Sequence, residues 1–596
     1  MGSSKKFIRL NNLNLLQKFT VVSVSLILSF FNSYGLKVNY PDGLGTMSGS
    51  YNDIGLFAKF VLLSILFATL SLGFISYQDS FVQEKNKLVS WLDHKMIFFK
   101  TKKKSFLFIL VLWGIFLLPF FPVVSGWDLV AQIHEMVDVK SSVAAANIFN
   151  VYPIGQYLTD GTNTVWTNQH GAFLTAFYGL TIKYSWLIFD SYLPAYLFLG
   201  LSHFLFAVFS YSYTLSVIHN VAKSTYLKAI GTVFIIFNPV IFLSTISLSK
   251  NPLFLSAFVL FMGLLIQILL QNKRMDIRWM TMTFFAVFLG SIAVKWASIL
   301  FFLVGVFLVF SLKKAGLKKI SISVLLPVAV IKIMLLILSS NGVILNGDPI
   351  EGKGLQIQQV GRYLKYYPND LSESQYKTLN KLFKVENMGK LYQTYNVDPL
   401  KSSGYPDKFS KASTQLGYRF QTVKKKDWED FNKVWLELYK KHPEVMNDGF
   451  VAQVGNYLEP SRIPMDDVAT TIPSDSIGHG YGSLQYSKWT HKLYHNIIRN
   501  GLGIIYDRVF NSHFAFFMHG NFWIVVLLLM APAYFSNWKK FTLIVPVLLQ
   551  IPIAMLSPLS NSTRYTLGLI AVTPMLLMLI NTKMQKDEKN HFKASR

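Results

Sequence analysis

The sequence predicts an all-α polytopic membrane protein with about twelve transmembrane helices and a mostly helical extracellular domain. Three observations support this fold class. Of the 596 residues, 52% are hydrophobic and only 15% are charged, whereas a soluble protein carries about 25% charged residues. The apolar residues fall in blocks long enough to cross a hydrocarbon core of about 30 Å. The basic residues gather in the short segments between these blocks.

The basic segments also predict how the chain is oriented. Lys and Arg near the ends of spans mark the cytoplasmic side of a membrane. With the N-terminus inside, the segments KTKKK, QNKRMDIR, KKAGLKK and NWKK and the C-terminal tail all fall inside. We expect a multi-pass protein of the cell membrane with both termini cytoplasmic, and we attribute the net charge of +26 to this orientation rather than to nucleic-acid binding. The predicted spans are residues 18–36, 54–76, 105–124, 192–217, 228–248, 253–271, 279–296, 297–312, 319–340, 515–535, 540–557 and 563–581.

One further apolar block, Ala172 to Phe189, is also long enough to cross a membrane. Counting it as a span would invert every later loop and place QNKRMDIR outside. Lys183 near its middle would be costly within the hydrocarbon core. We therefore interpret this block as a helix along the outer interface, with the alternative that it spans and another block does not.

Two polar segments then lie outside, residues 125–191 and the domain-sized 341–512. Helical spacing of apolar residues predicts helices from Ser372 to Phe383 and from Trp428 to Lys441 in the larger segment. Cysteine is absent, which excludes disulfides and thiolate chemistry and favours a Gram-positive cell envelope over a eukaryotic secretory compartment.

The strongest candidate for chemistry is Asp128, which follows a predicted span in the tripeptide GWD. A carboxylate at the outer membrane boundary could accept the proton of an attacking hydroxyl. It could also hold a divalent cation, although the sequence predicts no required cofactor and no dedicated metal site. The alternative is a solvated Asp that caps the following helix.

Several polar and basic residues recur at the same predicted level. Asn168 and His170 stand in TNQH just before the interfacial block, where either could bind substrate or serve the fold alone. Cations at outer ends of spans are expected to bind a phosphate, with snorkelling to lipid headgroups as the alternative. These cations are Lys250, Lys295, Arg362 and Arg564. Protease, hydrolase and NTPase motifs are missing from the sequence.

Taken together, the layout resembles the GT-C superfamily of membrane glycosyltransferases, and more narrowly an uncharacterised multi-pass family of Gram-positive bacteria. The resemblance lies in GWD after a span, TNQHGAF, SKNP, QIQQVGRY, VDPLKS, VWLELYKKHPE and the Arg-Tyr pair that opens the last span. It covers most of the chain after about residue 105, so the first two spans look like an addition. Asn251 replaces an acidic residue of the family pattern, and TNQH keeps a single His. Both changes argue against metal binding.

The resemblance implies a transferase that moves a sugar from a polyprenyl-phosphate donor to an extracellular cell-wall or surface glycopolymer. Asp128 would act as general base, and the four cations would stabilise the departing phosphate. Gln358, Gln359, Asn168, His170 and Tyr565 would help to bind substrate. The implied units are residues 1–104, 105–340, 341–512 and 513–596. A flippase of a lipid-linked glycan and a non-catalytic envelope assembly protein remain the alternatives.

Overall fold

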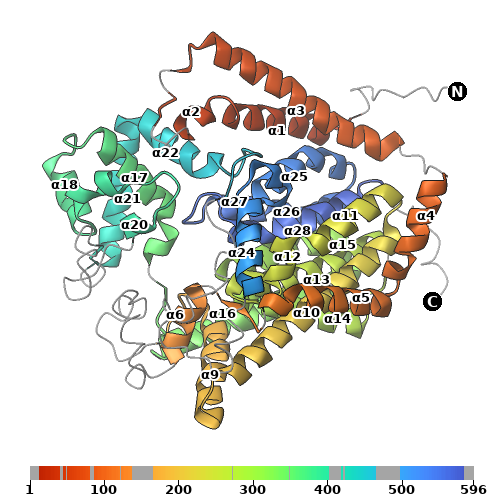
Figure 1. Ribbon diagram of the computed structural model, residues 1–596. Helices are drawn as coiled ribbons and strands as arrows, with labels where there is room; N and C mark the ends of the chain where they lie inside the picture. Colours follow the sequence, from red (N-terminus) through yellow and green to blue (C-terminus); the bar gives the residue numbers. More distant parts are fainter. Residues whose placement is uncertain are drawn as a thin grey trace.

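Helices make up most of the part of the chain that the computed structural model describes (Figure 1). The structure describes residues 13–39, 45–47, 50–80, 86–120, 122–125, 127–136, 166–271, 273–347, 349–401, 418–419, 423–464 and 497–582. Within these residues, seven helical segments are long and apolar enough to cross a membrane, and five shorter apolar helices accompany them. The prediction of an all-α membrane protein is confirmed, and the count of twelve spans stays a prediction.

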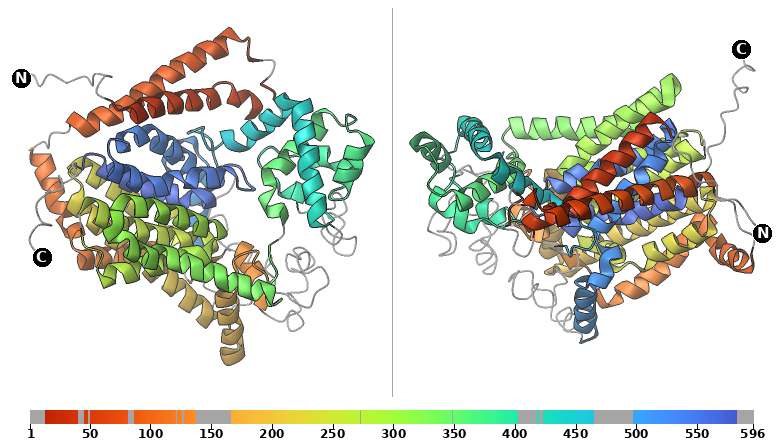
Figure 2. Two further views of the ribbon diagram at one scale, coloured as in Figure 1. Left: turned by 180° about the vertical axis from the view of Figure 1, so that it is seen from behind. Right: turned by 90° about the horizontal axis from the view of Figure 1, so that it is seen from above.

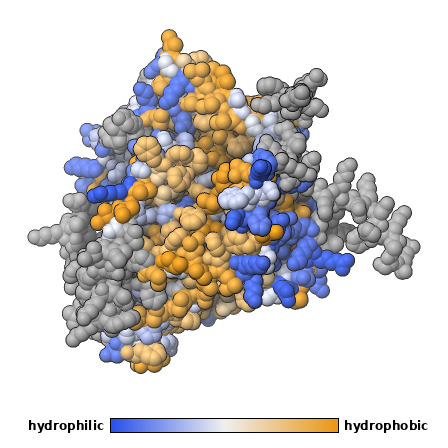
Figure 3. All heavy atoms as spheres, turned by 45° about the vertical axis from the view of Figure 1, so that its right-hand side comes forward, coloured by the Kyte–Doolittle hydropathy of each residue, from blue (hydrophilic) through white to orange (hydrophobic). Residues whose placement is uncertain are grey.

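The apolar helices pack into one bundle whose long helices run in roughly the same direction (Figures 1 and 2). A broad hydrophobic band with hydrophilic residues on both sides covers the face seen in Figure 3, as expected where lipid surrounds a protein. The bundle consists of α1 (Leu15–Phe31), α3 (Ile54–Ser80), α5 (Lys102–Leu117), α10 (Leu193–Val221), α11 (Thr225–Phe237), α12 (Pro239–Ser244), α13 (Lys250–Leu270), α14 (Ile277–Ala293), α15 (Lys295–Ile320), α16 (Leu326–Ser340), α25 (Gly520–Tyr534), α26 (Trp538–Leu548), α27 (Gln550–Met555) and α28 (Thr563–Leu579).

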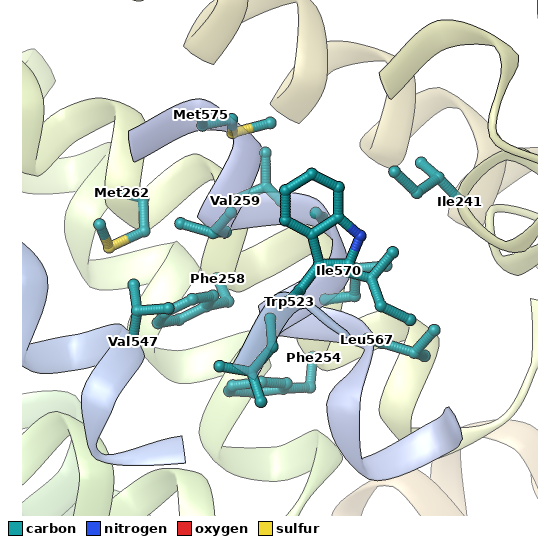
Figure 4. Packing of buried hydrophobic residues seen from close by; sticks show 14 of the residues in the cluster. Ile241, Phe254, Phe258, Val259, Met262, Trp523, Val547, Leu567, Ile570 and Met575 are labelled. Atoms are coloured by element: carbon teal, nitrogen blue, oxygen red, sulfur yellow. The ribbon is translucent and has the colours of Figure 1, made fainter. Parts of the chain in front are cut away.

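Helix α13 forms the centre of this bundle. It is apolar on every side, and all its residues from Asn251 to Leu270 are buried, which is the pattern of a helix enclosed by other helices. Figure 4 shows its side chains Phe258 and Met262 packed with residues of α25, α26 and α28. Because α13 is central, its first residue, Lys250, lies in the middle of one end of the bundle.

Two predicted spans differ in detail from the structure. The predicted span 228–248 is broken after α11, where Asn238 caps α12 by accepting from the Val240 amide and Pro239 begins the new helix. Helical backbone continues from α15 through a π-helical segment, Ser321–Leu325, into α16. The chain nevertheless reverses between the apolar segments Lys295–Ser311 and Gly316–Ser340, ahead of the π-helical segment, since a Cβ on Gly305 would lie 2.5 Å from a side-chain atom of Leu325.

The basic segments meet at one end of the bundle, which we call the basic end. There Lys228 pairs with Asp93 at 3.0 Å, and α4 (Lys87–Met96) lies alongside. The backbone of Lys100 accepts hydrogen bonds from Ser216 and Asn220, which ties the KTKKK segment to α10. The charges of Lys273 and Arg278 act on Lys102 of the same segment. The start of α26 is tied in turn to the end of α28, where Lys540 donates to the Ile580 carbonyl. This clustering is what a single cytoplasmic surface requires.

A separate hydrophobic core lies at the opposite end, within the described part of residues 350–446. Its helices are α17 (Gly354–Tyr366), α18 (Glu373–Asn380), α19 (Val385–Leu391), α20 (Asp398–Lys401), α21 (Lys425–Lys441) and α22 (Pro443–Gly455). Both predicted helices are present, and α18 begins with a capping box on Ser372. The second half of α22 packs into the main core of the bundle, so this domain is joined to the helices beneath it.

Helix α9 (Ala172–Phe189) is the block whose placement the sequence left open. Its length and composition would allow it to span, but its axis runs across the direction of the long bundle helices in Figures 1 and 2. It packs against α6 (Trp127–Met136) at the end of the bundle that carries the α17–α22 domain. This arrangement favours the interfacial interpretation.

Labelling single introduced cysteines tests this topology, because the natural chain contains no cysteine. Lys377→Cys, in the exposed α18, should react with a membrane-impermeant maleimide in intact cells. Lys104→Cys, at the basic end, should react only after the membrane is permeabilised. Ser191→Cys follows α9 and should behave like Lys377→Cys. Protection of Ser191→Cys in intact cells would mean that α9 crosses the membrane.

Candidate functional site

A short parallel strand pair places the two principal motifs side by side. Strand β1 (Val124–Ser125) pairs with β2 (Ser247–Leu248) in register, Val124 opposite Ser247. The first strand leads into α6 and the GWD motif, and the second leads into α13 and SKNP. Both motifs therefore emerge from the same edge, at the end of the bundle away from the basic end. The pairing explains how residues more than a hundred positions apart come into contact.

Asp128, Lys250 and His170 form the centre of the candidate site. The Lys250 Nζ lies 3.0 Å from one Asp128 oxygen, and the His170 Nδ1 lies 3.5 Å from the other. Lys250 Nζ is also 3.4 Å from His170 Nδ1. The carboxylate is 16% exposed and the amine 21% exposed, so this ion pair is largely shielded from water, and its attraction is stronger than at a surface.

The charges in this centre are well defined. Burial alone would raise the pKa of Asp128, but Lys250, His170 and Arg564 hold it well below its usual range. Burial and the nearby Lys250 lower the pKa of His170 to about 4, so its imidazole is neutral at pH 7. Lys250 can then donate to Nδ1, which leaves the proton on Nε2. That nitrogen is buried and has no hydrogen-bond partner among the residues that the structure describes.

The TNQH segment is held in place by its own backbone geometry. Gly171 has a φ of 91°, a conformation that favours glycine, and an added Cβ would lie 2.9 Å from the Ile292 carbonyl oxygen. The Asn168 side chain accepts from the backbone amide of Ala172, the first residue of α9, at 3.1 Å. Its own amide donates to the Leu345 carbonyl at 2.8 Å. Asn168 is thus mainly a structural residue that fixes the turn carrying His170.

Three helices begin at this site, each with a cation in its first turn. Lys250 opens α13 and Lys295 opens α15, while Arg564 is the second residue of α28. None of the three helices has a side-chain cap or an acidic residue in its first turn. The N-terminal end of a helix carries partial positive charge, so a cation in the first turn is normally unfavourable. Here each cation adds to the positive potential of its helix end. The site is consequently suited to an anion.

The predicted residues divide into two groups by position. Asp128, His170, Lys250, Lys295 and Arg564 interact electrostatically with one another at the site, which supports the predicted cluster. The Arg564 guanidinium lies 4.9 Å from the centroid of the Tyr565 ring, which packs against the main core. Tyr565 thus supports the arginine from one side.

The second group lies inside the α17–α22 domain and is not brought to Asp128. Arg362 is fully buried, 3.7 Å from Asp448, and it also donates to the Gly45 carbonyl. Gln358 donates to the Gln393 carbonyl, and Gln359 donates to the Met446 carbonyl. These bonds tie the domain together and to the segment that follows α2 (Gly35–Asn39). We therefore place none of the three at the site.

Three charged residues at the site were not selected from the sequence, namely Glu135, Glu351 and Lys401. Glu135 accepts from the amide and the hydroxyl of Thr167, at 2.8 and 2.9 Å, and burial raises its pKa to about 7. Glu351, in the 3₁₀ helix Pro349–Gly352, pairs with Lys401 of the VDPLKS motif at 2.8 Å. Glu135 follows Asp128 by seven residues and so shares its face of α6. That spacing was a usable signal for Glu135.

Unpartnered polar atoms surround the site. Among the described residues, Asn251 Oδ1, His170 Nε2 and Gln132 Oε1 are buried without a hydrogen-bond partner. Buried polar groups are normally bonded, so three beside one cluster indicate a place for a polar ligand. Among these residues, no group of three or more His, Cys, Asp or Glu side chains is placed to hold a metal ion.

A double-mutant cycle tests the Asp128–Lys250 pair. Lys250→Met should lower the melting temperature of the purified protein because it leaves the shielded Asp128 carboxylate without its nearest cation. The combined Asp128→Asn and Lys250→Met variant should lose less stability than the sum of the two single variants, by about 0.5–3 kcal/mol. Strict additivity in thermal or denaturant unfolding would show that the two groups are not coupled.

Comparison with known proteins identifies a family whose function is not known. The model of a family described as "Family of unknown function (DUF6020)" matches residues 9–594. The match includes α1 and α3, which the sequence alone led us to interpret as an addition. No curated protein and no solved structure matches significantly. Since the match covers nearly the whole chain, the protein belongs to the DUF6020 family.

Proposed function

We propose that the protein is a membrane glycosyltransferase that moves a sugar from a polyprenyl-phosphate donor to an extracellular cell-wall or surface glycopolymer. The observation that carries the proposal is the Asp128–His170–Lys250 cluster at three helix N-termini. It lies at the end of the bundle away from the basic end, where a lipid phosphate on the outer leaflet would sit. The resemblance to GT-C enzymes, in which GWD follows a span and opens an outer segment, supports the same reaction.

Asp128 is the proposed general base. Its carboxylate would accept the proton of the acceptor hydroxyl while that oxygen attacks the anomeric carbon and the bond to the phosphate oxygen breaks. With Lys250 3.0 Å away, the carboxylate is a weak base. A bound phosphate would compete for the Lys250 ammonium, which has three donors, and would so raise the basicity of Asp128 when donor is present.

The cations have a separate role in this reaction. Negative charge grows on the phosphate as the glycosidic bond breaks, and fixed positive groups in a water-poor site stabilise that charge. Lys250, Lys295 and Arg564 would supply them. His170 Nε2 is buried and has no partner among the described residues. With the imidazole proton on this nitrogen, it would donate to an oxygen of the sugar or the phosphate. No step in this scheme requires a metal ion.

The α17–α22 domain is the proposed site of acceptor binding. Lys401 connects it to the reaction site, since it bonds to Glu351 at 2.8 Å and Glu351 in turn accepts from Gln169 of TNQH. An acceptor bound to this domain would therefore lie next to the proposed base. The break at Pro239 is a feature that a flippase could also use, and sugar transfer distinguishes the two functions.

Replacing Asp128 with Asn tests the proposed base. Purified protein supplied with a radiolabelled polyprenyl-phosphate sugar and envelope glycan should transfer sugar, and Asp128→Asn should slow this by about 10²- to 10⁴-fold. Asp430→Asn is the matched control, because Asp430 lies on α21, outside the Asp128 cluster, and pairs with Lys433 at 2.9 Å. Lipid translocation without transfer would favour a flippase, and full activity of Asp128→Asn would remove it from the mechanism.

Gly347→Ala tests Lys295 without replacing it. A Cβ at Gly347 would lie 2.7 Å from Lys295 Nζ and 3.0 Å from Gln169 Oε1, so the lysine must move. Transfer should fall by about tenfold or more, because a displaced catalytic group loses its orientation. Gly352→Ala is the control, since a Cβ there meets nothing within 4 Å. Equal rates for both variants would show that Lys295 does not assist the reaction.

A further inference from the structure

The turn that connects α27 to α28 is polar yet buried. Its sequence, SPLSNST, contributes Ser557, Ser560, Asn561, Ser562 and Thr563, and each of these is at most 7% exposed. Polar groups in such a position are normally hydrogen-bonded. The hydrogen-bond partners of these polar groups therefore indicate the role of the turn.

One part of the turn binds it to the α17–α22 domain. The Ser560 hydroxyl donates to the Gln453 carbonyl at 2.6 Å, and the Gln453 side chain donates to the Ser557 carbonyl at 2.7 Å. The Tyr457 hydroxyl donates to the Leu559 carbonyl at 3.0 Å. Asn561 then adopts a left-handed conformation with a φ of 52°. These bonds hold the turn in a fixed shape against α22.

The other part of the turn has donors without partners. Within the part of the chain that the structure describes, Asn561 Nδ2 and Ser562 Oγ have no hydrogen-bond partner, although the two side chains are only 2% and 0% exposed. Ser562 is the residue that precedes α28, where a serine usually accepts from the first turn of the helix. Here its hydroxyl does not do so. Both groups therefore remain available at the N-terminal end of α28.

The turn adjoins the reaction site through the residue that follows it. Arg564 lies in the first turn of α28 and is close enough to act on the Asp128 carboxylate. A side-chain amide, a hydroxyl and a guanidinium thus stand within four successive residues, Asn561 to Arg564, at the N-terminus of a 17-residue helix. A phosphate group matches this set, because it offers several oxygen acceptors and negative charge to the positive end of the helix.

We propose that Asn561 and Ser562, with the N-terminus of α28 and Arg564, form the subsite that binds the phosphate group of a polyprenyl phosphate. The lipid is named on the basis of the proposed function, but the binding itself requires no sugar transfer. In this arrangement Asn561 Nδ2 and the Ser562 hydroxyl donate to phosphate oxygens. Lys250 and Lys295 face the same anion from the starts of α13 and α15.

Binding of a polyprenyl phosphate without sugar to the purified full-length protein tests the subsite. Asn561→Gly keeps the left-handed backbone, because glycine adopts it freely, and Ser562→Ala removes only the hydroxyl. Each variant should weaken binding of the polyprenyl phosphate by about tenfold, which corresponds to 1.4 kcal/mol, and should leave binding of the corresponding polyprenol unchanged. Unchanged melting temperatures would confirm that both variants fold.

Thr573→Val is the matched control, because Thr573 carries a buried, unpartnered hydroxyl ten residues further along α28. It should bind the lipid as the natural protein does. Natural affinity in both turn variants would overturn the subsite, as would an equal loss of polyprenol binding. Inorganic phosphate that binds as tightly as the lipid would overturn the choice of ligand.

The same measurements separate this subsite from the proposed transferase activity. A natural protein that binds polyprenyl phosphate through the turn but transfers no sugar would contradict the transferase and support the subsite. A protein that transfers sugar while both turn variants bind and transfer normally would contradict the subsite alone.

Discussion

The arrangement of the site depends on one electrostatic constraint. Three helices of the bundle start at the same end, and each places a cation in its first turn, where the helix already carries partial positive charge. Three such ends close together repel one another unless negative charge lies between them. Asp128 and Glu351 supply that charge from outside the bundle, and Glu135, whose pKa is about 7, adds to it when it is ionised. The end of the bundle and the segments that cover it are therefore held together by the same set of charges.

The charged residues are held in place by nonhelical backbone at this end of the bundle. Nonhelical backbone needs partners that lipid cannot supply, and here short ladders provide them. The β1–β2 pair positions Asp128, and the pairing of Thr167 with Leu345 positions the TNQH turn. In each pairing, a paired strand or residue stands one to three positions before a residue of the candidate site in the sequence. Local backbone pairing, rather than long side chains, sets the geometry of the charges.

The sequence was informative where a charged residue stands at the predicted outer end of a span. A carboxylate after a span and cations at outer span ends are rare enough to be noticed, which is why Asp128, Lys250, Lys295 and Arg564 could be selected. Arg362 satisfied the same rule and lies elsewhere, because its partner Asp448 is 86 positions away and the pairing depends on the domain fold. Glu351 was missed for the opposite reason. Its partner Lys401 becomes its neighbour only when α17 and α20 pack.

The fold follows the same division. Apolar blocks predicted the bundle, and the basic segments predicted that one end would collect positive charge, because both properties are local. The orientation of α9 could not be decided from hydropathy, since its 18 residues satisfy the length for a span. Its packing against α6 supplies the missing information. An apolar helix can lie across the bundle when another element covers its buried face, as Tyr178 and Ile182 of α9 illustrate.

The connection between the α17–α22 domain and the site has a consequence for any ligand. The domain contacts the site through Lys401 and Glu351, and it contacts the SPLSNST turn through Gln453 and Tyr457. Movement of the domain would change both the charge balance near Lys295 and the turn before Arg564. The two contacts flank the positions proposed for acceptor and phosphate. A ligand that fixes the domain in one position would therefore order the proposed acceptor position and the proposed phosphate position together. It could do so without making contacts of its own inside the membrane.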